Sequence, residues 1–281
     1  MELCNFSSEE TQQINRALEF IGTREVELRP LLARTLIVNT QHFADECTQL
    51  HGLYPELGLE DGAARLVFNT AQDGHHKILV NQQAITGLSF IHALVTQLVH
   101  LGNLHQFNSE HGNIYRLSAE QAIADHYYEF LLWTRFQAMK IATRAHALVS
   151  WHAVNGEAPP ADGRYRFAQV AFAVEPILAC LSTLEEAAKI DIWREGFWAL
   201  LLELTTYFGC LGFYQNSAQP TEVDEQFPVA AIDQQLGLEN CLKFYALLQT
   251  SDDYTTWKQM RGYLRQSVVA MQEHGHQRFA G

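Results

Sequence analysis

The chain has 281 residues, of which 47% are hydrophobic and 18% are charged, a composition that supplies a sizeable buried core. Its formal net charge is −13, and such a field repels phosphate backbones, so we expect no nucleic-acid partner. The five cysteines are widely spaced, which argues against a disulfide framework or a four-cysteine zinc site. The chain starts without the features of a signal peptide, and its longest apolar run, Phe197–Leu204, is too short to span a bilayer. We therefore expect a cytoplasmic protein with no membrane association.

The first 85 residues predict a mixed α/β region. Ser7 and Glu10 form a capping-box pattern that opens a helix ending near Gly22. A short helix is predicted over Gln41–Pro55, and the dipeptide Asp73-Gly74 is typical of a hairpin turn. Runs rich in β-branched residues predict strands at Arg34–Thr40, Ala63–Thr70 and His76–Asn81. We expect these strands to form a small, largely antiparallel sheet.

From residue 86 onward the pattern predicts helices. Thr86–Gln106 is expected to be a buried, mostly apolar helix that carries three histidines. Ser118 and Gln121 form a second capping box, which opens a helical run to about Val154. Later helices are predicted at about Phe167–Leu181, Thr183–Phe213 with Ser182 and Glu185 as its cap, Ala230–Leu248 with a break near Gly237, and Asp252–His274.

These elements predict an α+β fold that is predominantly helical. We expect an N-terminal α+β part over residues 1–154, with the small sheet, and a helical bundle part over residues 165–281. The long helix that begins near Ser118 could belong to both parts, so the two could form one compact unit.

The order of a strand, a histidine-bearing helix and an acid-bearing helix resembles the zincin metallopeptidases, most nearly the short prokaryotic ImmA/IrrE-like group. The matching segments are Lys77–Asn81, Thr96–His100 and Ala119–Leu132. In a zincin the pentapeptide H-E-x-x-H puts two imidazoles on one helix face, where both bind one metal ion. Its Glu acts as general base on the metal-bound water. The resemblance implies a zincin-like arrangement of the N-terminal part.

The pentapeptide departs from that pattern at two positions. Thr96 stands where the first histidine ligand would be, Gln97 stands where the general base would be, and His100 retains the second ligand. Threonine is a poor zinc ligand, and a glutamine amide does not act as a base. The resemblance therefore implies a pseudoenzyme with a degenerate H-E-x-x-H motif, a prokaryotic or phage regulatory protein that binds a protein or a peptide. The expected binding groove is lined by His92, Thr96, Gln97, His100, Asp125 and Glu129.

Two alternatives stay open. One is a metal-dependent hydrolase, with zinc as a possible cofactor, whose nonstandard ligands would be His100, His105, Asp125, His126 and Glu129. By resemblance the third ligand would be Glu120, Asp125 or Glu129, while His92 and His100 would lie about 12 Å apart on a continuous helix, too far to share an ion. His105 follows Gly102, where the helix could end. The other alternative is a helical interaction protein that is unrelated to zincins.

A structural explanation competes with each of these ideas. His92 and His100 alternate with apolar residues, which favours histidines that are hydrogen-bonded in the core, with Asp125 and Glu129 as their partners. In the later helices, the glycines at 209 and 212 indicate close helix packing.

Overall fold

The computed structural model describes residues 1–21, 24–55, 57–59, 62–71, 73–84, 86–157, 174–214 and 226–279. The fold is α+β and predominantly helical, as predicted. By its contacts the chain divides into unit 1, which comprises Met1–Gln121 and Ile141–Val170, and unit 2, which comprises Ala122–Lys140 and Ala171–Gly281. The predicted boundary between residues 154 and 165 stays a prediction, because a division by contacts does not show which segments fold independently.

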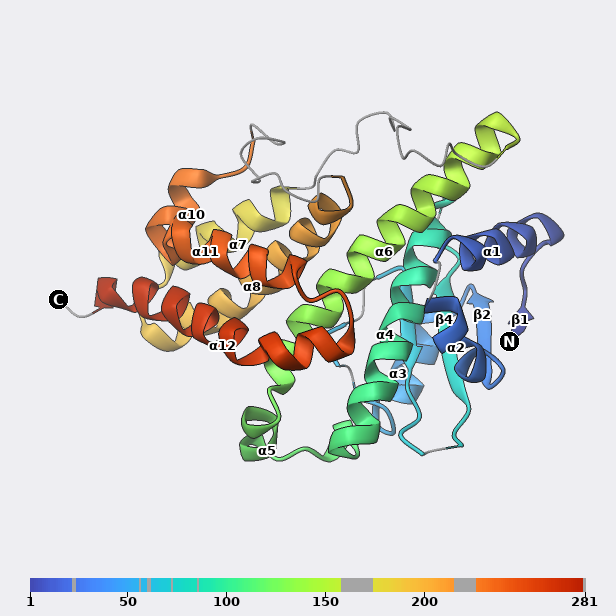
Figure 1. Ribbon diagram of the computed structural model, residues 1–281, viewed down its shortest axis with the longest axis horizontal. Coiled ribbons are helices and arrows are strands. Elements are labelled where there is room, and N and C mark those ends of the chain that lie inside the picture. The colour runs from blue at the N-terminus through green and yellow to red at the C-terminus, as the bar shows by residue number, and fades with distance from the viewer. Residues whose placement is uncertain are drawn as a thin grey trace. The chain divides into compact units, whose positions relative to one another are not determined.

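Unit 1 contains a small sheet and the helices that cover it (Figure 1). Its strands are β1 (Glu2–Cys4), β2 (Thr35–Thr40), β3 (Ala64–Val67) and β4 (His76–Asn81). Its helices are α1 (Ser8–Phe20), α2 (Arg24–Leu32), α3 (Phe43–His51), α4 (Ser89–His111) and the short η1 (Ile114–Arg116). The capping box predicted at Ser7 and Glu10 is present.

The sheet has the strand order β1-β2-β4-β3. β1 pairs with β2 and β2 pairs with β4 in parallel, whereas β3 pairs with β4 in antiparallel register. The predicted hairpin is therefore confirmed, but the prediction of a largely antiparallel sheet was wrong. α1 and α2 lie between β1 and β2, and α3 and β3 lie between β2 and β4, so each parallel pair is joined by a crossover. Two elements were not predicted: β1, which has only 3 residues, and α2, which contains Pro30.

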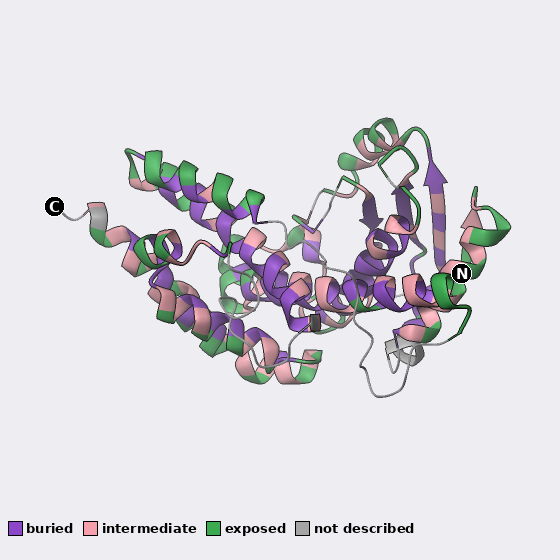
Figure 2. Cartoon of the chain, turned by 90° about the horizontal axis from the view of Figure 1, so that it is seen from above, coloured by how far each residue is buried: buried purple, intermediate pink, exposed green. Residues whose placement is uncertain are grey.

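Helix α4 is the central helix of unit 1, and it packs on β3 and β4 and against α1 and α2. Fourteen of its 23 residues are buried, including every residue from Ala93 to Leu101, as expected of a buried helix. Figure 2 colours the chain by burial and shows buried positions along most of its helices. The helix is longer than predicted. Gly102 lies inside the helix and does not end it. A side chain at this position would meet Leu28 of α2 at 3.0 Å, so the glycine allows close packing of the two helices. The true end is at His111, followed by Gly112 with φ +83°.

The helical run predicted from Ser118 is interrupted. The capping box is present, with Gln121 N donating to Ser118 Oγ at 3.2 Å and Ser118 N donating to Gln121 Oε1 at 3.1 Å. It opens only the short α5 (Ala119–Ala124), and a turn then precedes α6 (Tyr127–Asn155). His126 in this turn has φ +59°, a conformation that no helix continues through. The first part of α6 belongs to unit 2 and the remainder to unit 1.

Unit 2 is helical throughout its described residues. Besides the start of α6 it contains α7 (Glu175–Glu186), α8 (Ile190–Tyr214), α10 (Val229–Leu236), α11 (Leu238–Gln249), α12 (Tyr254–His276) and the short η2 (Gln277–Phe279). The break predicted near Gly237 is confirmed, with φ +73°. The cap predicted at Ser182 was wrong, because Ser182 and Glu185 lie inside α7. Phe167, the predicted start of this helix, lies outside the described residues.

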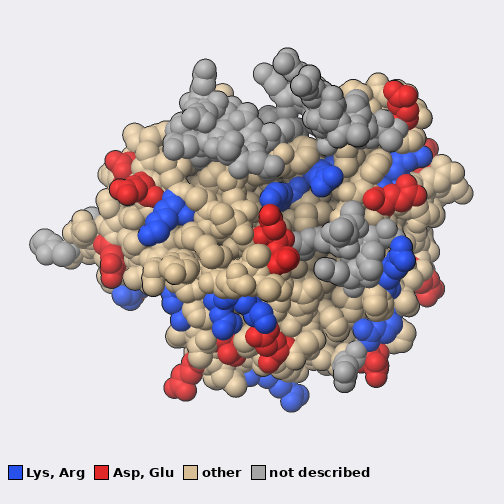
Figure 3. Space-filling view, viewed as in Figure 1, with Lys and Arg blue, Asp and Glu red and all other residues tan. Residues whose placement is uncertain are grey.

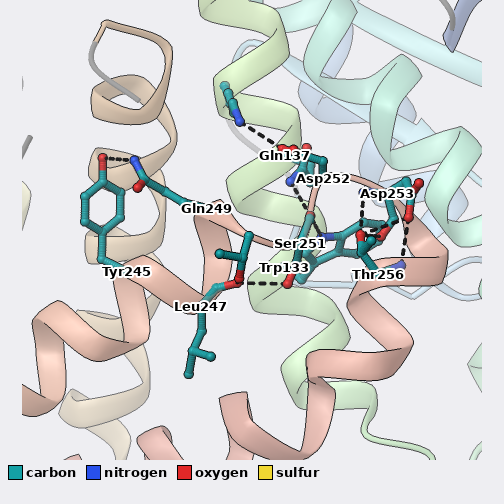
Figure 4. A network of polar contacts seen from close by, with 11 residues as sticks. Trp133, Gln137, Tyr245, Leu247, Gln249, Ser251, Asp252, Asp253 and Thr256 are labelled. Carbon is teal, nitrogen blue, oxygen red and sulfur yellow. Dashed lines mark hydrogen bonds and ion pairs between the residues drawn. The ribbon is translucent and has the colours of Figure 1, made fainter. Parts of the chain in front are cut away.

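Aromatic side chains form the core of unit 2. Trp133, Trp193 and Trp257 are fully buried. Trp133 Nε1 and Gln137 Nε2 both donate to the carbonyl oxygen of Ser251 at 2.7 Å, which joins α6 to the turn between α11 and α12 (Figure 4). The predicted close packing at the paired glycines of α8 is confirmed. A side chain at position 209 would meet the backbone and side chains of α6 at 2.5–2.7 Å.

One helix in the described part of the chain, Ile190–Phe213 within α8, is long and apolar enough to cross a membrane. In this structure 61% of that window is buried. A core helix of a helical bundle can have the same length and composition, so this finding alone does not distinguish a membrane-spanning helix from a core helix.

Candidate functional site

The three positions of the degenerate motif lie in the middle of α4 and are buried. Thr96, Gln97 and His100 are exposed by 4%, 1% and 1%. The hydroxyl of Thr96 donates to the carbonyl oxygen of His92, one turn earlier in the same helix, at 2.9 Å. The side chain at the first ligand position is thus hydrogen-bonded to its own helix backbone.

Gln97 connects α4 to the sheet. Its Oε1 accepts a hydrogen bond from the backbone N–H of Leu66 in β3 at 3.1 Å. Because an N–H group can only donate, the amide oxygen must face Leu66, and Nε2 is left buried without a partner among the described residues. The position that a zincin gives to its general base therefore holds an edge strand in place.

Strand β3 is an edge strand, and side chains from α4 and η1 cover its outer edge. These side chains bind one outward backbone group of β3 and two carbonyls of the segment that follows the strand. The three bonds are Leu66 N–H to Gln97 Oε1 at 3.1 Å, Tyr115 O–H to the Phe68 carbonyl at 3.0 Å, and Asn108 Nδ2–H to the Thr70 carbonyl at 3.2 Å. Unpaired edge groups are where a partner strand would add, so this edge is closed to strand addition at these positions.

His92, which was predicted to line the groove, lies against the later part of α6 within unit 1. Its Nε2 is 3.3 Å from the hydroxyl oxygen of Thr143, and its ring is 6.4 Å from that of His146, centroid to centroid. Burial, and then the neighbouring His146, lowers the pKa of His92 to about 4, and burial also lowers the pKa of His146. Both rings are therefore neutral at pH 7.

The predicted metal ligands of α4 do not converge through a loop. Because α4 is continuous to His111, His100 and His105 are separated by five helical residues and point about 140° apart around the axis. The suggestion that the helix ends at Gly102, which would have let them approach, was wrong. His105 lies towards the C-terminal end of the helix, where burial and then Arg34 lower the pKa of its imidazole.

The other predicted ligands belong to unit 2, at the start of α6. Both carboxylate oxygens of Glu129 accept hydrogen bonds from Arg265 of α12, at 3.0 and 3.2 Å. His126 Nδ1 lies 3.6 Å from the same carboxylate. Burial, followed by Arg265, lowers the pKa of His126 in spite of the opposing effect of Glu129. Asp125 is partly buried beside them. The partners of Glu129 seen here are thus Arg265 and His126, both in unit 2, instead of the histidines of α4.

No metal site is formed by the described residues. They include no group of three or more His, Cys, Asp or Glu side chains placed to hold an ion. Of the five predicted ligands, His100 and His105 are in unit 1, and Asp125, His126 and Glu129 are in unit 2.

On the face drawn in Figure 3, Lys and Arg lie singly or in small groups beside Asp and Glu.

A polar hollow of about 350 Å³ lies in unit 1 where β3 and α4 end. Its lining residues come from the segment after β3 and from the last turns of α4 with the residues that follow. They are Asn69, Thr70, Ala71, His105, Asn108, Ser109, Gly112 and Asn113. None of these is Asp, Glu, Lys or Arg. The hollow has the size of a small ligand pocket and a lining made mainly of hydrogen-bonding groups.

No family model, no curated protein and no solved structure matches this chain.

Sequence patterns missed the hollow, although they singled out one residue in it. His105 was predicted as a metal ligand and instead contributes a neutral imidazole to the lining. The sequence feature that could have indicated the hollow is a set of asparagines. Asn69 lies just after a strand, and Asn108 and Asn113 lie around a helix end. Asparagine favours such ends because its side chain bonds to nearby backbone, so the pattern alone predicted turns and no site.

Proposed function

We propose that this chain is a zincin-like protein without peptidase chemistry, an intracellular regulator that acts by binding another protein or a peptide. The observation that carries the proposal is the hydrogen bond from Leu66 N–H to Gln97 Oε1. A general base must accept a proton from a metal-bound water, and an amide oxygen that is already bound to a buried backbone N–H is neither basic nor available.

The neighbouring motif position supports the same proposal. A first zinc ligand must offer a lone pair to the metal, whereas the Thr96 hydroxyl lies against the carbonyl of His92 and is 4% exposed as a residue. Its hydrogen bond and that of Gln97 stabilise the packing of α4, which is a use for these positions that needs no metal. The regulatory role, in a prokaryote or a phage, comes from the resemblance alone.

The arrangement of unit 1 is compatible with a zincin-like origin. An antiparallel edge strand, β3, lies beside parallel strands, and the motif helix packs on β3 and β4. A helical interaction protein with no zincin ancestry would not need a strand beside this helix. Because the outward N–H of Leu66 is already bound, a peptide strand added at β3 would lack that hydrogen bond, which favours recognition at another surface of the unit.

The test combines a cleavage assay with a binding assay on the full chain. The protein, with equimolar zinc added, is incubated with a tryptic digest of a bacterial proteome, and new peptide ends are sought by mass spectrometry. We expect none. In parallel, a library of 12-residue peptides displayed on phage is selected against the immobilised protein, and we expect specific sequences to be enriched.

The control variant is His100→Ala, with its folding checked by circular dichroism. Cleavage by the wild-type chain that is lost in this variant and on addition of EDTA would overturn the proposal and favour the metal-dependent hydrolase. A selection that enriches no peptide over an unrelated protein would also count against it. Because His100 is buried, EDTA treatment of the wild type provides the second measurement if the variant fails to fold.

A further inference from the structure

We propose that the polar hollow at the C-terminal end of α4 is a recognition site for an uncharged peptide segment, which it binds through its amide groups. This inference rests on the proposed binding function and names the site and the chemistry of the ligand.

The lining offers unused donors and an unused acceptor, and the hydrogen bonds already made fix which atoms these are. Asn69 Oδ1 accepts from Ala71 N at 3.0 Å, and Asn113 Oδ1 accepts from Tyr115 N at 3.0 Å, so each amide keeps its Nδ2 as a donor, with no partner among the described residues. Asn108 Nδ2 donates to the Thr70 carbonyl, which leaves Asn108 Oδ1 as a buried acceptor with no partner among the described residues. Leaving such an atom unbound costs about 1–3 kcal/mol.

The wall formed by the segment after β3 is held rigidly. The Phe68 ring stacks on His76 with centroids 5.1 Å apart, and Asn69 N–H donates to His76 Nδ1 at 3.2 Å. Tyr115 binds the Phe68 carbonyl and Asn108 binds that of Thr70. A site whose walls are fixed before binding loses less conformational entropy when a ligand arrives.

The charge of the lining selects a neutral ligand. Apart from His105 its side chains do not ionise, and burial and Arg34 keep the His105 imidazole uncharged at pH 7 by lowering its pKa. An ammonium group would enter a lining without a countercharge and near the Arg34 guanidinium, and a carboxylate or phosphate would find no cation among the lining residues in exchange for its hydration. Nucleic acid is disfavoured further by the net charge of −13.

Among neutral ligands a peptide fits better than a sugar. A peptide presents one N–H donor and one C=O acceptor per residue, and the asparagine amides offer the complementary pair. The lining has no Trp, Tyr or Phe ring on which the apolar face of a sugar could stack. Asparagine or glutamine side chains in the ligand would repeat the same pairing.

The probe for the test is N-acetyl-asparagine methylamide, which carries backbone and side-chain amides and no charge. It is titrated into the full, 15N-labelled protein while the side-chain NH₂ signals of Asn69, Asn108 and Asn113 are followed by NMR. We expect saturable shifts of these signals with the amide probe and smaller ones with methyl glucoside or inorganic phosphate. Absence of a shift, or a larger response to the glucoside, would overturn the inference.

Two matched variants locate the binding. Ser109→Tyr places a ring in the hollow from an exposed position of α4, and Gln82→Tyr adds the same ring at an exposed position after β4. We expect the amide probe and the selected phage peptides to bind at least roughly tenfold more weakly to Ser109→Tyr and unchanged to Gln82→Tyr. Thermal unfolding checks that both variants fold. The NMR titration of the wild-type protein does not depend on either variant.

The outcomes separate this inference from the proposed function. If the selected peptides bind wild type and Ser109→Tyr equally, the hollow is not the site, although the chain remains a peptide-binding protein. If the peptides are cleaved in a zinc-dependent way, the proposed function fails whatever the hollow binds. Weaker binding of both the amide probe and the peptides in Ser109→Tyr alone supports the two proposals together.

Discussion

Helix α4 carries polar side chains in two regions that use them differently. In the middle, Thr96 and Gln97 are buried, and each makes a hydrogen bond to backbone of its own unit. Near the C-terminal end, Asn108 and Ser109 line an open hollow with His105. They too bond to backbone, at the carbonyls of Thr70 and His105, but Asn108 Oδ1 is left without a partner among the described residues. One helix thus has a structural middle and an end that is suited to binding.

A sequence motif reports only that a residue is polar. It does not distinguish a polar side chain that is bonded within the fold from one that is available for chemistry. A polar side chain in a buried segment stabilises the fold only if it is bonded, and once bonded it is unavailable for chemistry. A polar side chain at the rim of a hollow is partly solvated, and only the donors or acceptors that its own bonds leave unused are available to a ligand. Changes in the middle of α4 should therefore alter stability, and changes at its end should alter binding.

The largest expected effect follows from removing the Gln97 side chain. Gln97→Ala leaves the buried N–H of Leu66 unbound and opens a cavity, so we expect the free energy of unfolding to fall by about 2–4 kcal/mol. The control is Gln106→Ala, which removes the same side chain from a partly exposed site on the same helix and should cost less than about 1 kcal/mol. Urea unfolding followed by circular dichroism measures both. Equal losses would remove the distinction between the two regions.

Acidification should destabilise unit 1 through its buried histidines. Burial, as the largest cause, lowers the pKa of His76 and of His92 to about 4 each. The unfolded chain then binds more protons than the folded one as the pH falls below the ordinary histidine pKa, so stability is complete above about pH 6.5 and is lost progressively towards pH 4. By this linkage the expected loss is on the order of 2–3 kcal/mol for each histidine by pH 4.5.

The measurement is the urea midpoint between pH 7 and pH 4.5. His92→Gln should flatten part of this dependence, while His75→Gln, at an exposed position, should leave it unchanged. A midpoint that rises on acidification would contradict the prediction. The same protonation of His76 would break its bond from Asn69 N–H, so binding in the hollow should weaken over the lower part of this range.

In unit 2 the predicted metal ligand Glu129 is comparable with Thr96 and Gln97, because its carboxylate is already hydrogen-bonded. Glu129→Gln leaves Arg265 without its countercharge, and since Arg265 is 31% exposed we expect a loss of about 1–2 kcal/mol. Asp191→Asn, which breaks the exposed ion pair with Arg194, should cost less than about 0.5 kcal/mol.

Elemental analysis of the wild-type chain and of Glu129→Gln tests the metal hypothesis directly. Zinc bound in about one equivalent to the wild type and absent from Glu129→Gln would show that Glu129 serves a metal, and would contradict the structural role assigned to it.

Much of the fold was predictable where the deciding contacts are local. The capping box at Ser7, the break at Gly237 and the start of α12 near Asp253 depend on residues within one or two turns. The strand order was not predictable in the same way, since β1 is short and its partner Leu36 lies far along the chain. Pairing of that kind depends on packing and leaves no periodic pattern.

The same distinction between local and distant contacts applies to the candidate site. The sequence placed Thr96 and Gln97 in a buried helix correctly, but the role of Gln97 depends on Leu66, 31 residues earlier. The hollow depends on the meeting of Asn108 with Thr70, 38 residues apart. Composition and spacing report residue types, whereas which atoms remain unbonded is decided only when such distant segments meet.

The smallest expected effect is at Thr96, and it tests the middle of α4 most sharply. Thr96→Val keeps the shape of the side chain and removes the hydroxyl that binds the His92 carbonyl. A threonine that bonds back to its own helix slightly disfavours the helix, so the loss of this bond is offset, and we expect a change in unfolding free energy within about 0.5 kcal/mol. Binding of the selected peptides should also be unchanged, because Thr96 is distant in the helix from the residues that line the hollow. If peptide binding were lost while stability was retained, the hydroxyl would have to contact the ligand, and the middle of α4 would be part of the binding site after all.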